Sequence, residues 1–261
     1  MSRWIARLYP APHARVRLFT LPYAGGSALI YHAWPKSLPA AVELNAIQLP
    51  GRGSRLSEPP FTRMEPLVRK LAGELLPHLD RPFAIFGHSM GAVVGFELAR
   101  HLRREHGLEP RHLFVSGCSA PQYPDSRAPF HKLSREELLR ELRRLGGTSQ
   151  KVMHEEELMD MLLPTLRADF EVLETYTYEA ESPLACPISA FGGLEDDYAA
   201  RASLEAWRAQ TSSRFSLRMF NGDHFFLQSS EGSLLAAISR DLYPHYSSEE
   251  QLTSSSSLRA D

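Results

Sequence analysis

Gly87-His88-Ser89-Met90-Gly91 follows the apolar run Pro82-Phe83-Ala84-Ile85-Phe86 and precedes Ala92-Val93-Val94-Gly95-Phe96-Glu97-Leu98-Ala99-Arg100. A G-x-S-x-G pentapeptide alone is a weak signal, but between a buried strand and a helix it is typical of a nucleophile elbow. Small residues must flank so tight a turn, which accounts for Gly87 and Gly91. The following helix directs its N-terminus at the serine, where negative charge is favoured. We therefore predict that Ser89 is a nucleophile rather than an incidental serine in a glycine-rich turn.

The composition is that of an ordinary globular protein: 261 residues, of which 43% are hydrophobic and 23% charged. This length suits one large α/β domain, or one domain with an insertion. The formal net charge of -2 predicts no attraction to nucleic acid or to anionic membranes. No run of about 18 apolar residues occurs, and the first residues lack an apolar segment, so we expect neither a membrane span nor a signal peptide. We expect a cytoplasmic protein in which Cys118 and Cys186 are buried free thiols.

Strand-like and helix-like segments alternate along most of the chain. Apolar runs predict strands at 16–21, 42–49, 82–86, 113–117, 187–193 and 215–220. Helical patterns occur at 64–79, after the elbow, at 204–209 and at 234–242. Such alternation predicts an α/β fold whose mostly parallel sheet is covered by helices on both faces.

The middle of the sequence differs from the rest. Between residues 127 and 181 strands vanish, and helices are predicted after a capping-box pattern at Ser134, at 154–163 and at 166–176. We therefore divide the chain into a core of residues 1–126 and 182–245, a helical lid insertion of residues 127–181, and a tail of residues 246–261 that we expect to be disordered. Ligands of such sheets bind at the carboxyl ends of the strands, where Ser89 lies, so the insertion would cover it.

A serine nucleophile needs a base, and the base needs an acid that orients it. In the elbow context these residues follow in the order Ser, then Asp or Glu, then His. Only His224 and His245 lie beyond the helical insertion. His224 follows a turn at the end of a strand, whereas His245 borders the polar tail, so we predict that His224 is the base.

The acid is expected on a strand-end loop between the insertion and the base. The loop after the strand that ends at Phe191 contains Glu195, Asp196 and Asp197. One of these carboxylates is the predicted acid, and we favour Asp196 over Asp197. Asp223 is too close to His224 in sequence to be the first choice.

An oxyanion hole needs two backbone N–H donors aimed at the developing negative charge. Met90, the residue after the nucleophile, supplies the first predicted donor. The second is expected from the loop after the first long strand, Pro22-Tyr23-Ala24-Gly25-Gly26, and we predict Ala24. The plain alternative is an ordinary Gly-Gly turn.

Several separated motifs together resemble the type II thioesterases of polyketide and nonribosomal peptide assembly lines, which are α/β-hydrolases. The matching stretches are 21–27, 49–55, 86–91, 96–100, 145–147, 163–169 and 224–227. No single motif is decisive, but together they are specific and extend over residues 15–243. The resemblance therefore implies an α/β-hydrolase fold with a helical lid.

The resemblance also implies roles for individual residues. Ser89 is the implied nucleophile and His224 the implied base. Counting from the second strand-end glycine gives Asp196 as the acid, whereas counting back from a downstream tryptophan gives Asp197. Many relatives have glycine where this chain has Asp223, whose carboxylate either raises the pKa of His224 or points to solvent.

The activity implied by the resemblance is that of a free-standing enzyme acting in trans. It would hydrolyse acyl groups from the phosphopantetheine arm of acyl or peptidyl carrier proteins through an acyl-serine intermediate. We therefore expect a carrier protein as the partner, a monomeric enzyme, no cofactor and no metal.

Two other functions remain open at this point. A general carboxylesterase or lipase would share the same three residues without a preference for carrier-bound acyl groups. A non-catalytic hydrolase-like binding protein is the other alternative, although it would have no need to keep Ser89, Asp196 and His224 together.

Overall fold

A single sheet of mostly parallel strands forms the centre of the computed structural model, which describes residues 3–7, 9, 11–123, 129–147 and 150–247. The strand order is β1-β3-β2-β4-β5-β6-β7, and only β1 runs antiparallel to its neighbour. The strands are β1 (Ile5–Ala6), β2 (Val16–Leu21), β3 (Val42–Ile47), β4 (Phe83–His88), β5 (His112–Ser116), β6 (Ile188–Gly193) and β7 (Phe215–Phe220). This arrangement confirms the predicted α/β class with a mostly parallel sheet.

The central strands are buried along their whole length because apolar clusters cover both faces of the sheet. Successive side chains of a strand point to opposite faces. In β2, Phe19 and Leu21 pack into one cluster, and Val16 and Leu18 pack into the other. A strand that is buried on both sides needs a continuous apolar run, which is the pattern the sequence shows.

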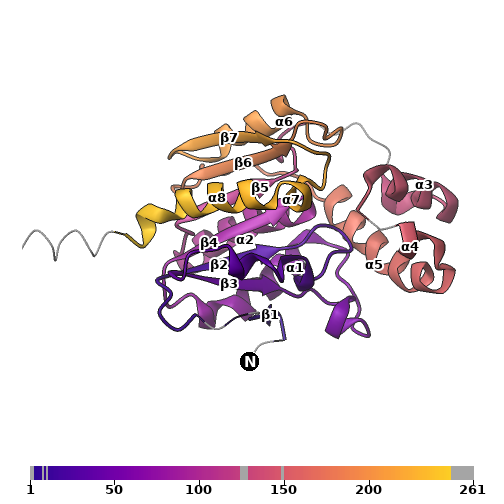
Figure 1. Cartoon of the computed structure of the whole chain (residues 1–261), viewed down its shortest axis with the longest axis horizontal. Helices are drawn as coiled ribbons and strands as arrows, with labels where there is room; N and C mark the ends of the chain where they lie inside the picture. Colours follow the sequence, from indigo (N-terminus) through magenta and orange to yellow (C-terminus); the bar gives the residue numbers. More distant parts are fainter. Residues whose placement is uncertain (1–2, 8, 10, 124–128, 148–149, 248–261) are drawn as a thin grey trace, which may run out of the picture.

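Helices lie on both faces (Figure 1). Helices α1 (Met64–Leu75) and α2 (Met90–His106) contribute to the first cluster, and α8 (Glu231–Leu242) contributes to the second together with the short 3-10 turns Ala28–Tyr31 and Trp34–Lys36. The short helices α6 (Arg201–Glu205) and α7 (Phe226–Ser229) follow β6 and β7. The sheet is therefore enclosed everywhere except at its two ends and its edges.

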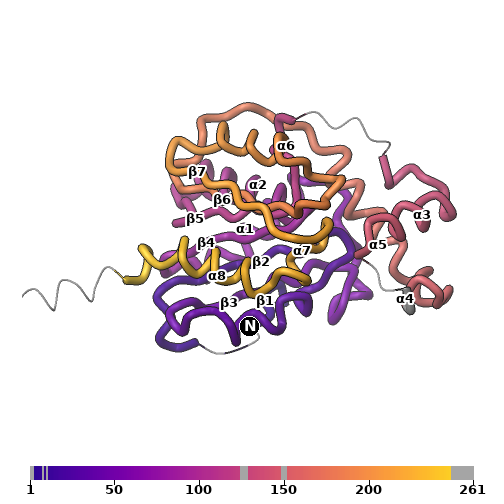
Figure 2. Tube along the Cα trace, turned by 45° about the horizontal axis from the view of Figure 1, so that its top comes forward, coloured from indigo at the N-terminus to yellow at the C-terminus, as the bar shows by residue number. Residues whose placement is uncertain are grey.

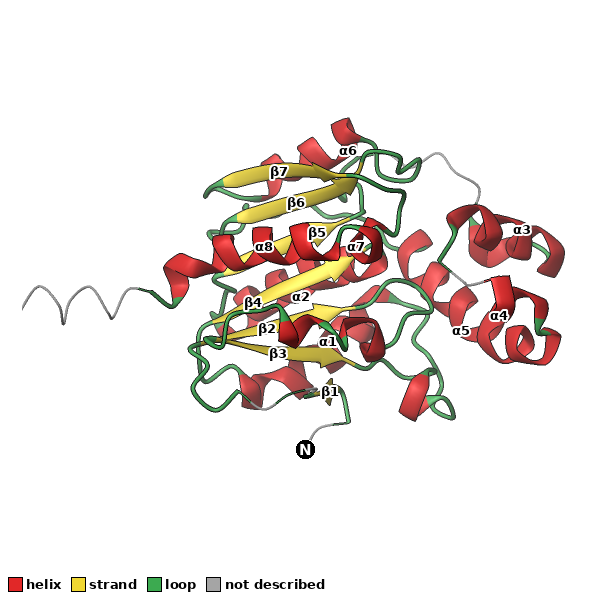
Figure 3. Ribbon diagram, in the orientation of Figure 1, coloured by secondary structure: helices red, strands yellow, loops and turns green. Residues whose placement is uncertain are grey.

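A separate helical block extends beyond the carboxyl ends of the strands. It is seen in the turned tube view (Figure 2) and in the ribbon view (Figure 3). It consists of α3 (Arg135–Leu145), α4 (Gln150–His154) and α5 (Glu156–Glu174). These helices share an apolar cluster of their own, which contains Leu138, Leu142, Met159 and Leu163. The block corresponds to the predicted insertion of residues 127–181, and its role as a lid stays a prediction. From residue 248 on, the predicted disordered tail lies outside the described residues.

The prediction of separate helices at 154–163 and 166–176 is wrong, because α5 runs without a break from Glu156 to Glu174 and contains Pro164. Proline removes one backbone hydrogen bond, to the carbonyl of Asp160, and usually kinks a helix. Both Pro164 and Asp160 are exposed, so water can satisfy that carbonyl. Leu163 and Leu166 on either side of the proline are buried in one apolar cluster, and this packing outweighs the lost bond.

Smaller differences from the sequence prediction have local causes. The predicted helix at 64–79 ends at Leu75, and a 3-10 turn that contains Pro77 follows it at Leu76–His78. The two-residue strand β1 was not predicted, because so short a segment has no periodicity. Cys186 is buried as expected, whereas Cys118 is only half-buried, and neither forms a disulfide bond within the described residues. Within the described residues, none of the helices has the length and apolarity that crossing a membrane requires.

The packing of α2 against the sheet depends on Gly91, which we propose to test by substitution. A Cβ atom added there would lie 2.3 Å from the carbonyl oxygen of Leu21, so Gly91→Ala should lower the free energy of unfolding by about 1–3 kcal/mol. The control is Gly73→Ala in α1, where nothing lies within 4 Å and the free energy of unfolding should rise by about 0.5–1 kcal/mol. Urea unfolding measures both. Equal midpoints for the two variants would contradict the close approach.

Candidate active site

Ser89 occupies a strained turn between β4 and α2. Its φ of 52° makes it the one non-glycine residue with a positive φ in the described part of the chain. Such a backbone is costly and persists only where the surroundings enforce it, which is common at functional sites. Its N–H donates a 2.7 Å hydrogen bond to the carbonyl of Ser116 at the end of β5. This strand–turn–helix geometry confirms the predicted elbow conformation, while the nucleophilic role of Ser89 stays a prediction.

The two glycines of the pentapeptide make the turn possible. A Cβ atom on Gly87 would lie 2.0 Å from the carbonyl oxygen of Gly91, and a Cβ atom on Gly91 would meet the end of β2. Neither position has room for any side chain. The elbow therefore brings the start of α2 directly against the loop that follows β2.

His224 and Asp196 form a buried pair at the carboxyl ends of β7 and β6. Nδ1 of His224 lies 2.9 Å from Oδ2 of Asp196, whose side chain is fully buried. The N–H groups of Tyr198 and Ala199 donate to the other carboxylate oxygen, at 2.8 and 3.2 Å. Burial raises the pKa of Asp196, but the bond from His224 and the two backbone N–H groups outweigh burial and lower it. The carboxylate therefore stays ionised, so His224 donates through Nδ1 and its Nε2 is left as a proton acceptor.

The other carboxylates near this pair in sequence are exposed. Asp197 and Glu195 are exposed, and among the described residues His224 forms no hydrogen bond or ion pair with either of them. Asp223 is exposed as well, and its Oδ1 accepts a 2.8 Å hydrogen bond from the N–H of Phe225. Of the two aspartates that the sequence left open, the structure thus brings Asp196 to the histidine. Asp223 is thus an exposed carboxylate that binds the backbone of Phe225.

Residues 23–26 form a tight turn beside the elbow. The N–H of Gly26 donates to the carbonyl of Tyr23 at 2.8 Å, and Gly25 has a φ of +76°. The N–H of Gly25 donates to Asp169 of α5 at 2.7 Å. Ala24 lies between these two fixed peptides, and Met90 is the first residue of α2, where backbone N–H groups have no partner within the helix.

A cavity of about 880 Å³ joins these residues. Ala24, Ser89 and His224 all line it, and the helical block contributes apolar side chains that include Leu142, Leu162 and Phe170; Met90 itself is buried behind the wall. Small-molecule sites usually have about 300–1,000 Å³ and mostly apolar walls. Among the described residues, no group of three or more His, Cys, Asp or Glu side chains is arranged to hold a metal ion.

His88 has an environment that the sequence argument did not foresee. Its side chain is fully buried, its Nδ1 lies 2.9 Å from Oγ of Ser116, and its ring centroid is 5.2 Å from that of His224. Burial, followed by the proximity of His224, lowers the pKa of His88 to about 3. The ring is therefore neutral and adds no charge beside the His224–Asp196 pair. The G-x-S-x-G pattern accepts any residue at this position, so the pattern alone gave no reason to expect a buried histidine there.

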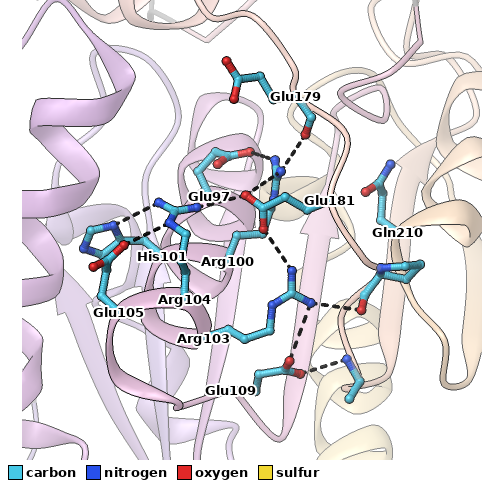
Figure 4. A network of polar contacts seen from close by, with 12 residues as sticks. Glu97, Arg100, His101, Arg103, Arg104, Glu105, Glu109, Glu179, Glu181 and Gln210 are labelled. Carbon is cyan, nitrogen blue, oxygen red and sulfur yellow. Dashed lines mark hydrogen bonds and ion pairs between the residues drawn. The ribbon is translucent and has the colours of Figure 1, made fainter.

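The segment that returns from α5 to the sheet is anchored on α2 (Figure 4). Arg100 is buried and donates to Oε1 of Glu97 at 2.5 Å and to the carbonyl of Glu179 at 2.6 Å. Arg100, Arg103 and Arg104 all pair with Glu181. Tyr176 also donates to Glu97, at 2.6 Å. Residues 176–178, which line the cavity, are therefore held to the same helix that begins beside Ser89.

The chain is similar to known proteins over most of its length. A family model described as a thioesterase domain matches residues 16–242. The chain belongs to the thioesterase family. This thioesterase is 48% identical over 244 residues to linear gramicidin dehydrogenase LgrE of Brevibacillus parabrevis, and the alignment covers 92% of this chain and 93% of LgrE.

Solved structures agree with that assignment. RedJ, a thioesterase from the prodiginine pathway of Streptomyces coelicolor, is 41% identical with a TM-score of 0.84, over 89% of this thioesterase and 88% of RedJ. BorB, the type II thioesterase from the borrelidin biosynthetic cluster, is 39% identical with a TM-score of 0.84, over 92% of this chain and 97% of BorB. Both comparisons confirm the predicted α/β-hydrolase fold and the resemblance to type II thioesterases.

The buried His88 should make stability depend on pH. Its pKa in the folded state, about 3, is below the ordinary value of 6.5, so below pH 6.5 only the unfolded chain takes up this proton. The free energy of unfolding should therefore fall between about pH 6.5 and pH 3, by up to about 1.4 kcal/mol per pH unit for this group. Urea unfolding between pH 7 and pH 5 should show a flatter slope for His88→Asn.

The matched control is Ser116→Ala, which removes the partner of Nδ1 and keeps the titrating ring. It should lower stability while the slope with pH persists. The slope that remains in His88→Asn has other sources, such as His112, whose pKa burial also lowers to about 3. An unchanged slope in His88→Asn would show that the pKa of His88 is the same in the folded and unfolded states, and would contradict the prediction.

Proposed function

We propose that this thioesterase is a stand-alone editing enzyme of the type II class, which hydrolyses acyl thioesters from the phosphopantetheine arm of carrier proteins in a polyketide or nonribosomal peptide pathway. The observation that carries the proposal is one cavity with a largely apolar wall, lined by Ser89 on its strained turn and by His224, which is paired with buried Asp196. The family match and the pathway names of RedJ and BorB support the substrate class.

The proposed mechanism consists of two acyl-transfer steps. Nε2 of His224 takes the proton of the Ser89 hydroxyl while Oγ attacks the thioester carbonyl carbon. The N–H groups of Met90 and Ala24 stabilise the tetrahedral oxyanion. The carbon–sulfur bond then breaks, the pantetheine thiol leaves with the proton from His224, and an acyl-serine remains. Water that gives a proton to His224 then attacks the acyl-serine, the bond between the acyl carbon and Oγ breaks, Oγ takes the proton back from His224, and the acid is released.

Asp196 is the proposed acid of this mechanism. Its buried, ionised carboxylate holds the imidazole in the tautomer that leaves Nε2 free, and it stabilises the imidazolium that forms in each step. The helical block α3–α5 is the proposed lid over the same cavity, since it supplies much of the apolar wall. In this scheme the phosphopantetheine belongs to the substrate, and the reaction needs no further cofactor.

The substrate class is tested by mass spectrometry of acyl-loaded carrier proteins. The wild-type enzyme should release the acyl group and leave the free thiol on the arm, and Ser89→Ala should release none because the nucleophile is gone. Aryl esters and acyl-pantetheine serve as substrates without a carrier. Hydrolysis of aryl esters with every carrier thioester left intact would indicate a general esterase. Binding of acyl carriers without any turnover would indicate a non-catalytic binding protein.

The choice of acid is tested by comparing Asp196→Asn with Asp197→Asn. Asp196→Asn should lower kcat by about 10⁴-fold, because the amide holds the histidine in the wrong tautomer. Asp197 is exposed, so Asp197→Asn should change kcat by less than about threefold, in line with the small effect of most surface substitutions. Steady-state kinetics with acyl-pantetheine give both values. A large loss confined to Asp197→Asn would reverse the assignment.

A further inference from the structure

One turn of α5 contacts two loops at the carboxyl ends of β2 and β3. Oγ1 of Thr165 donates a 2.7 Å hydrogen bond to the carbonyl of Gly51. Leu166 packs against Gly25 so closely that a Cβ atom on the glycine would lie 2.5 Å from Cδ2 of the leucine. Asp169, one turn further along, accepts the N–H of Gly25. The helix is therefore in direct contact with the turn of residues 23–26.

Asp169 forms a bidentate ion pair with Arg52, and both side chains are only 4% exposed. Nη1 of Arg52 lies 2.5 Å from Oδ2 and Nη2 lies 2.6 Å from Oδ1. Two further donors of the guanidinium, on Nε and Nη1, reach the carbonyls of Pro50 and Gly26, at 3.2 and 3.4 Å. A buried bidentate pair with these additional hydrogen bonds holds both partners in one geometry.

Asp169 fixes the peptide that follows Ala24. The hydrogen bond from Gly26 to Tyr23 and the φ of +76° at Gly25 are those of a type II turn with Ala24 at its second position. The peptide before Ala24 is fixed by that hydrogen bond, because it contains the carbonyl of Tyr23. The peptide after Ala24 carries the N–H of Gly25, which Asp169 accepts at 2.7 Å. The Ala24 N–H belongs to the first of these peptides, and the second adjoins it at the Cα of Ala24, so the turn that presents this N–H is held on both sides.

We propose that Asp169, paired with Arg52, is a positioning residue for the oxyanion hole, an inference that rests on the proposed role of the Ala24 N–H. An oxyanion hole works because its donors are in place before charge develops, to within about 0.5 Å. Asp169 provides that placement from α5, outside the hydrolase core. Arg52 has an equally specific part, because an unpaired carboxylate behind the turn would oppose the negative charge of the intermediate, and the guanidinium cancels it.

The test compares three variants with acyl-pantetheine, a substrate that needs no carrier protein. Asp169→Asn should lower kcat by about 10–100-fold and change KM by less than about threefold, since loss of a whole oxyanion donor costs about 10²–10³-fold in kcat. Thr165→Val is the matched control: it removes a hydrogen bond from the same turn of α5 to Gly51 without touching residues 23–26. Its kcat should stay within about threefold of the wild-type value.

The double variant Arg52→Met/Asp169→Leu separates positioning from stability. Replacing both partners of a buried ion pair by apolar groups is often neutral for stability, whereas removing one leaves a buried charge unpaired. The double variant should therefore recover most of the Tm that Asp169→Asn loses, while its kcat stays low because Gly25 has no acceptor. Recovery of kcat together with Tm would show a purely structural pair and overturn the proposal.

A second readout does not depend on turnover. An acyl trifluoromethyl ketone adds to the serine and places an oxyanion in the hole, whereas the corresponding acyl amide binds the cavity without reacting. Asp169→Asn should weaken inhibition by the ketone about as much as it lowers kcat, and leave binding of the amide within about threefold. Equal weakening of both ligands would overturn the proposal.

The activity of the wild-type enzyme separates this proposal from the proposed function. A wild-type enzyme that cleaves acyl-pantetheine but no carrier thioester would refute the proposed function alone, and one that cleaves neither would refute both.

Discussion

The close approach of α2 to the end of β2 is the constraint on which the rest of the site depends. Gly91 faces the carbonyl of Leu21 with no room for a Cβ atom, and Gly87 faces the carbonyl of Gly91 in the same way. This contact bends the backbone at Ser89 to a positive φ and sets the first N–H groups of α2 beside the turn of residues 23–26. The strained serine and the place of the Met90 N–H beside that turn therefore both depend on these two close contacts.

Two buried carboxylates lie around the site, and they differ in what balances their charge. Asp169 is paired with the permanent cation of Arg52, so the two side chains together carry no net charge. Asp196 is held by His224 and two backbone N–H groups, none of which carries a permanent charge. In the proposed mechanism the negative charge of Asp196 is therefore available to the imidazolium when it forms. The neutral ring of His88 preserves that balance, because a second cation there would oppose protonation of His224.

The sequence predicted the parts of the fold in which local pattern and tertiary environment agree. Buried parallel strands need unbroken apolar runs, so β2 and β4 to β7 were found almost to the residue. Asp196 and Asp197 are adjacent and chemically identical, and only the fold decides which of them is turned inward to His224. Arg52 and Asp169 are 117 residues apart in sequence, so their pairing has no local signal, although each stands as a charge within a mostly apolar or glycine-rich motif.

Helix α5 shows how tertiary contacts override a local rule and what that implies for the helical block. Before Pro164, Met159 and Leu163 pack with α3 and α4, and after it Thr165 and Asp169 bind the loops of the core. The helix is thus shared between the block and the site, and its weakest backbone position lies at the boundary between the two halves. A movement of the block that carried residues 165–169 with it would break the Arg52 pair and release Gly25. A lid movement that keeps the site intact must therefore be confined to α3, α4 and the part of α5 before the proline.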